Sequence, residues 1–471
     1  MNKVPYLIFC LIFFVDYTIY KTPLPGVFGW TPELLSAVLI VVLLLRMAST
    51  KVFNLPVRYL VLFGLLILHM IVGIILNDVT EGPIIVGLRY YLKFFPFFLL
   101  PAVFSFSDIQ MKTQLKVLLA LALLQLPVTV YQRFIEFSNV ASGDSISGTL
   151  RISSILSIFL ICSIFVTLAY YLKKRISGKL AFLIAILLFI PCTLNETKGS
   201  IVLLPFGLLS MIIISFRSDL EVKKALGIFS VLGILFLGFA FAYNSLYQKI
   251  DSGGGLLSFF SGDAVESYLY QDVQFDPEIL DRHGDNSALA SKTIEEEVRM
   301  PRMDRLIAPF AIMYTKPLNL YFGLGIGNVT QPKFPEWAGE YTYISHLMAA
   351  DRLMMSLMLW EIGIGGVIIY LIFFYMLFVD IYRLSNMNSF ASTVATGWMG
   401  VLTLIVIALV YKNIAQFNVI GYLFFYFSGY IAAARFKSDA VDPNSLLVEQ
   451  PTKSTYFVTP LPAKAEHHYA K

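Results

Sequence analysis

The stretch VRYLVLFGLLILHMIVGIIL, residues 57–76, decides the fold class. It is twenty residues long and almost wholly apolar, and about 20 helical residues are needed to cross roughly 30 Å of hydrocarbon. Similar runs recur along most of the chain, in which 57% of the 471 residues are hydrophobic and 14% are charged. Inside a bilayer only helices and closed barrels satisfy the backbone, and runs of this length indicate helices. We therefore expect an all-α polytopic membrane protein.

About twelve transmembrane helices are expected on this criterion. The predicted spans cover residues 5–20, 33–48, 57–76, 83–106, 115–136, 150–172, 179–195, 199–216, 224–246, 352–379, 393–412 and 415–435. The first run meets no small-residue cleavage site, so we expect it to stay as a helix rather than to be removed as a signal peptide. Cys10, Cys162 and Cys192 all fall within predicted spans, which favours packing roles over disulfides.

One long, mostly polar stretch divides the chain. The expected parts are transmembrane helices 1–9 in residues 1–243, a large loop in residues 244–350, and transmembrane helices 10–12 in residues 351–436. Within the loop, apolar residues at helical spacing from Arg302 to Tyr314 predict a short interfacial helix. Residues 437–471 contain four prolines and little periodicity, so a disordered cytoplasmic tail is predicted there.

Basic residues near the span ends predict the orientation, because Lys and Arg resist translocation. Those that share one face are Lys3, Arg46, Lys51, Arg58, Lys112, Lys116, Lys173, Lys174, Arg175, Lys179, Arg217, Lys223, Lys224, Arg383, Arg435 and Lys437. Both termini are therefore expected to be cytoplasmic and the large loop extracytoplasmic, which in a bacterium means the outer face of the inner membrane. The net charge of +4 is small and dispersed, so nucleic acid is not an expected partner.

Several cations are candidates for binding an anion at the outer face. Arg89 and Lys93 lie four residues apart in the fourth predicted span, hence on one helix face, where they need water, an acid or an anionic ligand; the alternative is snorkelling toward the interface. Arg133 lies at the outer end of the fifth predicted span. Lys198 lies in a short outer turn, and a solvated lysine is the alternative there.

The large loop and its end add further candidates. Arg299, Arg302 and Arg305 are spaced by three, as on one side of a helix. The run Phe322-Gly-Leu-Gly-Ile-Gly-Asn328 lacks the frame of a nucleotide site, and close packing or approach to a ligand explains its glycines better.

His346, Asp351 and Arg352 stand where the loop re-enters the membrane. A structural role for His346 and a salt-bridge or helix-cap role for Asp351 are the alternatives to catalysis. The five histidines show no metal-ligand spacing, so no metal site is expected.

The order of the motifs resembles the family of O-antigen ligases and Wzy-type polysaccharide polymerases. The matching elements are Tyr131-Gln with Gly148-Thr149, Thr197-Lys-Gly-Ser200, Asp304-Arg-Leu306, Phe322-Gly-Leu-Gly-Ile-Gly-Asn328 and Glu361-Ile-Gly-Ile-Gly-Gly366. Two features depart from the ligase pattern. The position eleven residues before Gly363, where ligases have a His-Asn-like pair, is Arg352, and His346 lies six residues earlier. Lys198 stands in place of an arginine, keeping its charge but losing its bidentate geometry. Both departures weaken the likeness to the ligases and are compatible with the polymerase branch, whose motifs are looser.

The resemblance implies a glycosyltransferase that joins undecaprenyl-pyrophosphate-linked repeat units of O-antigen, capsule or exopolysaccharide by inverting transfer. Its expected partners are that lipid-linked oligosaccharide, membrane lipid, and flippase and chain-length regulator proteins. Arg89, Lys198 and Arg305 are assigned to the pyrophosphate, with Arg133 and Arg352 as weaker candidates. Asp351 or His346 is the expected general base. With arginines neutralising the leaving group, neither a metal nor another cofactor is required.

Other functions remain open. A ligase would differ in its acceptor alone. A transporter or flippase would use the loop as a lid, and Asp16, His69, Arg89, Lys93 and Glu361 would line its pathway. A scaffold would have no activity of its own but would capture a partner enzyme.

Overall fold

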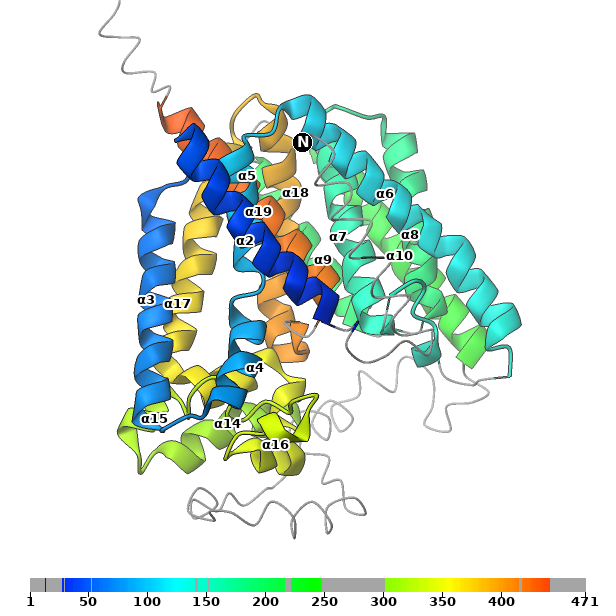
Figure 1. Cartoon of the computed structure of the whole chain (residues 1–471). Helices are drawn as coiled ribbons and strands as arrows, with labels where there is room; N and C mark the ends of the chain where they lie inside the picture. The colour runs from blue at the N-terminus through cyan, green and yellow to red at the C-terminus, as the bar shows by residue number, and fades with distance from the viewer. Residues whose placement is uncertain are drawn as a thin grey trace, which may run out of the picture.

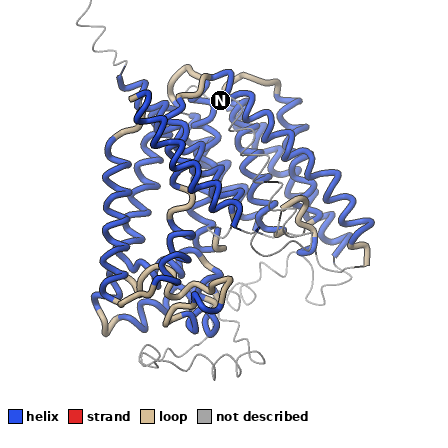
Figure 2. The backbone as a smooth tube through the Cα atoms, in the orientation of Figure 1, coloured by secondary structure: helices blue, strands red, loops and turns tan. Residues whose placement is uncertain are grey.

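The computed structural model describes residues 13, 28, 30–51, 53–139, 143–150, 152–195, 197, 199–216, 222–247, 301–414 and 417–440, and in these the regular secondary structure is helical (Figures 1 and 2). The helices are α2 (Thr31–Thr50), α3 (Val57–Leu76), α4 (Glu81–Tyr91), α5 (Phe95–Phe104), α6 (Asp108–Tyr131), α7 (Ser153–Leu172), α8 (Gly178–Leu194), α9 (Gly199–Phe216), α10 (Val222–Tyr247), α14 (Arg302–Met313), α15 (Pro317–Phe322), α16 (Thr342–Met348), α17 (Met354–Ser385), α18 (Phe390–Tyr411) and α19 (Asn418–Ala440).

The helices confirm the class of an all-α, multi-pass membrane protein. Within the described residues eight helices are long and apolar enough to cross a membrane, and the bent pair α4–α5 would make a ninth. Helix α8 and the Leu203–Phe216 part of α9 are apolar but shorter. The predicted span 5–20 lies outside the described residues, so the count of twelve stays a prediction.

The expectation of one helix over residues 83–106 is wrong. Helix α4 ends at Tyr91, and α5 leaves at an angle of 48°. In a continuous helix the N–H of residue 96 would bond to the carbonyl of Leu92, and Pro96 has none. Pro96 lies instead in the first turn of α5, where that group is not needed. Arg89 and Lys93 consequently do not share the face of one helix.

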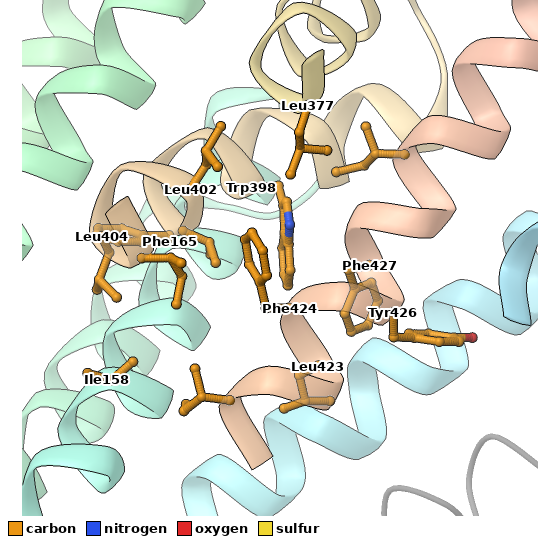
Figure 3. Packing of buried hydrophobic residues seen from close by; sticks show 14 of the residues in the cluster. Ile158, Phe165, Leu377, Trp398, Leu402, Leu404, Leu423, Phe424, Tyr426 and Phe427 are labelled. Atoms are coloured by element: carbon orange, nitrogen blue, oxygen red, sulfur yellow. The ribbon is translucent and has the colours of Figure 1, made fainter. Parts of the chain in front are cut away.

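The centre of the bundle is formed by α7, α18 and α19, which are the most buried of the apolar helices. The Trp398 indole stacks on Phe424 at 6.3 Å between ring centroids, and its Nε1 donates to Ser428 Oγ at 3.0 Å (Figure 3). A side chain at Gly400 would meet the ring of Phe165 in α7. Small residues let helices approach closely, and close packing stabilises helix pairs in a membrane, where the hydrophobic effect does not.

A cap of short helices covers one end of the bundle. We use this name for residues 301–353, which contain α14, α15 and α16 (Figure 1). Its apolar residues form a core of their own, in which Ala308, Ile312 and Ile344 pack with Trp360 of α17. The predicted short helix over Arg302–Tyr314 agrees with α14, which spans Arg302–Met313.

A glycine-rich turn attaches the cap to a break in α17. Gly363 has a φ of +62° and interrupts the helix. Opposite the break, the amides of Leu324 and Gly325 donate to the carbonyls of Trp360 and Glu361 at 2.7 and 3.1 Å. Gly327 has a φ of +73°, and a side chain there would clash with the carbonyl of Pro83. The glycine pattern is therefore explained by close backbone packing.

Glu361 joins three elements at this break. Its Oε1 accepts hydrogen bonds from the Val329 amide at 3.2 Å, and from the Thr330 amide and hydroxyl at 2.8 and 2.7 Å. Its Oε2 accepts one from the Tyr91 hydroxyl of α4 at 3.0 Å. The side chain is fully buried. Glu361 thus links α17, the cap and α4.

Candidate functional site

A cluster of charged side chains gathers where the cap meets the bundle. Arg302 and Arg305 lie in the first turn of α14, and their spacing of three places them on one side of it. Asp351 and Arg352 belong to a single 3₁₀ turn, Ala350–Arg352, just before α17. The Ser356 hydroxyl donates to the Arg305 carbonyl at 2.8 Å, which holds α14 against the start of α17.

Arg305 lies at the centre of this cluster. Burial lowers the pKa of its guanidinium, the nearby charges of Arg352 and Arg302 lower it further, and Asp351 opposes the shift. Its Nε is buried and has no hydrogen-bond partner among the described residues. A half-buried cation with two like charges beside it gains from an anionic ligand more than a solvated arginine would.

Asp351 shares this environment. Burial raises the pKa of its carboxyl, while Arg352, a hydrogen bond from its own backbone, His346 and Arg305 act in the opposite direction. Asn413 holds the turn that carries Asp351. Its backbone N–H donates to the Arg352 carbonyl at 2.9 Å, and its side-chain Nδ2 donates to the Asp351 carbonyl at 2.7 Å. The carboxyl is therefore held in a defined place beside the arginines.

His346 lies at the edge of the same cluster. It is exposed on α16, and its Nδ1 lies 3.2 Å from Nε2 of Gln331. It acts to lower the pKa of the Asp351 carboxyl, and only four residues separate the two in the sequence. The structure thus brings together Arg305, Arg352, Asp351 and His346, four of the seven residues that were singled out from the sequence.

Two neighbours were missed from the sequence. The Arg302 guanidinium lies 5.0 Å from the centre of the Tyr411 ring at the end of α18. Asn413 follows it and is buried, with Oδ1 lacking a hydrogen-bond partner within the described part of the chain. The polar run Tyr411-Lys-Asn413 between two apolar helices was the signal available, but only the fold places it beside the cap.

Arg89 belongs to a different set of contacts. Its Nε donates to Glu33 Oε1 at 2.6 Å, and its guanidinium lies 4.9 Å from the centre of the Trp30 ring. Trp30 packs in turn against Phe334 and Trp337 of the cap. A paired, stacked arginine has less to gain from a ligand, so these contacts favour a structural role. Lys93 is buried, with Nζ 4.8 Å from the centre of the Phe94 ring.

Arg133 also lies apart from the cluster. It sits in the π-helical turn Gln132–Glu136 that continues α6, and Figure 1 shows that end of α6 at the right edge of the bundle, away from α14 and α16. Lys198 lies outside the described residues.

The Tyr131-Gln and Gly148-Thr149 motifs form a structural clamp. Gln132 exchanges hydrogen bonds with the backbone of Gly148 at 2.8 and 3.0 Å. Gln125, two turns earlier, accepts from the Thr149 amide at 2.9 Å and donates to its hydroxyl at 2.9 Å. The two glutamines thereby hold a loop onto α6.

The cluster has the chemistry of an anion site with a carboxylate and an imidazole at its edge. Arginines suit phosphate because their planar fork offers paired donors. Among the described residues no group of three or more His, Cys, Asp or Glu is placed to hold a metal ion.

These features define a multi-pass helical membrane protein with a capped, cationic site at one end of its bundle. No family model matches the chain, and no characterised protein matches its sequence significantly.

Proposed function

We propose that the protein is a polysaccharide polymerase that joins undecaprenyl-pyrophosphate-linked repeat units at the outer face of a bacterial inner membrane. The observation that carries the proposal is the convergence of Arg302, Arg305 and Arg352 with Asp351 and His346 in the cap. A lipid-linked donor needs cations for its pyrophosphate, a base for the acceptor hydroxyl, and a position at the membrane boundary. The cluster offers three cations and two candidate bases, and it lies where the cap meets the end of the bundle.

In the proposed reaction the acceptor hydroxyl attacks the anomeric carbon of the donor glycan. The new C–O bond forms on the face opposite the breaking bond to the pyrophosphate, which leaves with the electron pair and inverts the configuration. The hydroxyl proton passes to the base. Because pyrophosphate is already a competent leaving group, the protein chiefly stabilises its charge and aligns the acceptor.

Arg305 and Arg352 are the proposed pyrophosphate ligands. Arg305 is carried by α14, and its Nε lacks a protein partner among the described residues, so this donor is available to an anion. Asp351 is the first candidate for the base, because burial raises the pKa of its carboxyl and a more basic carboxylate accepts a proton more readily. His346 is the second, as a neighbour that is open to solvent.

The arrangement of basic residues supports an outer position for the cap. The loops that join α2 to α3 and α7 to α8 lie at the end opposite the cap (Figure 1); the first carries Lys51, and the second carries Lys174 and Arg175. Short basic loops stay in the cytoplasm. An outer cap meets its lipid-linked substrate after a flippase has delivered it, and chain-length regulators act at the same face.

The test is complementation of a strain that lacks the protein, with its glycans resolved by size. Arg305→Ala is expected to lower polymer formation about 100-fold or more, as loss of one preorganised charge stabiliser does, and single repeat units should accumulate. The matched control is Lys333→Ala, which removes an exposed cation from the same cap. Polymer at the wild-type rate from Arg305→Ala would exclude the assignment.

The same experiment separates the two other activities. Long chains stranded on undecaprenyl pyrophosphate would identify a ligase, which transfers finished glycan to a terminal acceptor. An unchanged glycan profile would favour a transporter. The contacts disfavour the transporter, because His69 Nε2 lies 2.7 Å from the Ile362 carbonyl and Glu361 accepts four internal hydrogen bonds. Asp16 lies outside the described residues.

A further inference from the structure

An apolar cavity of about 300 Å³ lies between α6, α7, α8, α18 and α19. Its walls include Phe159, Trp398 and Phe424, and the two rings of the last pair are seen face to face in Figure 3. Leu180, also in its lining, is 47% exposed, so the cavity reaches the outer surface of the bundle. On a membrane protein that surface faces lipid, and an apolar cavity open to it is accessible to an acyl chain.

The cavity extends toward the cap. Ile405, Ile420 and Phe424 line both this cavity and a smaller one of about 50 Å³. The smaller cavity reaches Met354 at the start of α17 and Ile414 beyond the end of α18. A continuous apolar lining thus runs from the end with the basic loops toward the end that carries the cap.

The charged residues that line the large cavity are Lys112 and Lys116, one turn apart on α6. Lys112 Nζ and the Arg175 guanidinium lie 5.2 and 5.8 Å from the centre of the same Phe390 ring. Arg175 therefore lies beside the same entrance as Lys112. Asp108 precedes Lys112 by one turn and offsets one charge. The entrance keeps a net positive charge.

A second, open hollow adjoins this entrance. Lys174, Arg175 and Lys224 line it, and it shares Ile176 with the apolar cavity. Basic residues therefore surround the point where the apolar lining meets the aqueous boundary. The apolar cavity matches the acyl chain of a lipid, and the cationic rim matches an anionic headgroup.

We propose that this cavity binds an anionic phospholipid from the leaflet at the basic end. Its phosphate lies between Lys112 and Lys116, beside Arg175, which already donates to the Thr393 hydroxyl and the Ser389 carbonyl. One acyl chain extends past Trp398 toward Phe424. A zwitterionic lipid fills the same apolar space but carries no net charge for the rim. Each basic residue near a membrane surface contributes about 1 kcal/mol toward an anionic lipid, so the two lysines together should give a preference of about thirtyfold.

Trp398 provides the measurement, because a brominated acyl chain quenches an indole that it touches. The purified full-length protein would be titrated in mixed micelles with brominated phosphatidylglycerol or brominated phosphatidylcholine. The Trp398→Phe protein, measured in parallel, isolates the contribution of Trp398. Quenching by phosphatidylglycerol is expected at concentrations about thirtyfold lower than quenching by phosphatidylcholine.

Lys112→Gln/Lys116→Gln should remove most of that difference. The matched control is Lys51→Gln/Arg383→Gln, which removes two exposed cations from the same end, away from the cavity, and should leave the preference unchanged. Ser163→Phe places a ring in the cavity and should weaken quenching by both lipids. Equal quenching by the two lipids, or a preference that survives in the double lysine variant, would overturn the proposal.

Discussion

The Asp351 carboxyl combines two opposing influences in one small space. Burial alone favours its neutral form, and the arginines on either side favour its charged form. The net result is a raised pKa, which differs from a surface aspartate paired with an arginine. A carboxylate with a raised pKa is a stronger base than an ordinary aspartate. A stronger base accepts the proton of an attacking hydroxyl more readily.

We expect Asp351→Asn to lower the rate of polymerisation about 100-fold or more, the usual contribution of a general base. In the wild type the rate should fall as the pH drops through a pKa above the usual aspartate range, because protonation removes the base. The measurement is the pH profile of repeat-unit joining by purified protein. A residual rate in Asp351→Asn that keeps the wild-type acid limb, together with loss of the limb in His346→Ala, would assign the base to His346.

Stability provides the control for this variant. Because the folded pKa of Asp351 is raised above the unfolded value, the native state binds more protons between the two values, and stability falls as the pH rises through the folded pKa. Asp351→Asn should therefore be at least as stable as the wild type at neutral pH. Loss of activity with unchanged thermal stability would locate the effect in the reaction.

At the scale of elements, the break in α17 is held by the side chain of Glu361. Four donors from the cap and α4 point at one carboxylate, all inside the protein. A buried donor left without a partner costs about 1–3 kcal/mol. The position of the cap over the bundle, and with it the place of the charged cluster, depends on these bonds.

Three substitutions that remove these hydrogen bonds should lower the stability of the protein by increasing amounts. Tyr91→Phe removes one donor and should lower the stability by about 1 kcal/mol. Glu361→Gln presents an amide to donors and should lower it further, and Glu361→Ala, which leaves all of them unpaired, should lower it most. The measurement is thermal unfolding of the purified protein in detergent. An order in which Glu361→Gln is as stable as the wild type would contradict the role of the carboxylate.

The elements also show what the sequence could predict. The limits of α3 and α14 follow from local hydropathy and spacing, and both agree with prediction. Hydropathy does not register the break between α4 and α5, because Phe94 and Pro96 are as apolar as a span requires. The break in α17 is equally hidden, since Gly363 adopts its positive φ only against the turn at Gly323.

The candidate site was predicted in part for a similar reason. Arg352, Asp351 and His346 flank the point where the loop rejoins the membrane, so their sequence positions already suggest proximity. Arg305 lies far earlier in the sequence, and the packing of α14 against the start of α17 brings it to them. Arg89 and Arg133 were grouped with them by charge and side of the membrane, but Glu33 pairs with the one and the course of α6 carries the other away. Pairing partners distant in sequence decide such cases, and one sequence does not display them.

At the scale of the whole molecule the two ends differ in kind. One end carries the cap and its charged cluster, and the other carries short basic loops and the rim of the lipid cavity (Figure 1). The Arg58 guanidinium pairs there with Asp380, which also accepts from the Tyr59 hydroxyl at 2.6 Å, so α3 and α17 are tied at that end. The proposed glycosyl transfer requires this polarity to match the membrane, with the cap outside.

This orientation gives the last prediction. In a protein whose own cysteines are replaced, Glu336→Cys in the cap should react with a membrane-impermeant thiol reagent added to intact cells. Lys51→Cys, exposed at the opposite end, should react only after the inner membrane is permeabilised. Both variants should make polymer at the wild-type rate, which shows that the labelled protein is folded. The reverse labelling pattern would place the charged cluster in the cytoplasm, where a lipid-linked repeat unit that has already been flipped is out of reach, and the polymerase assignment would fail.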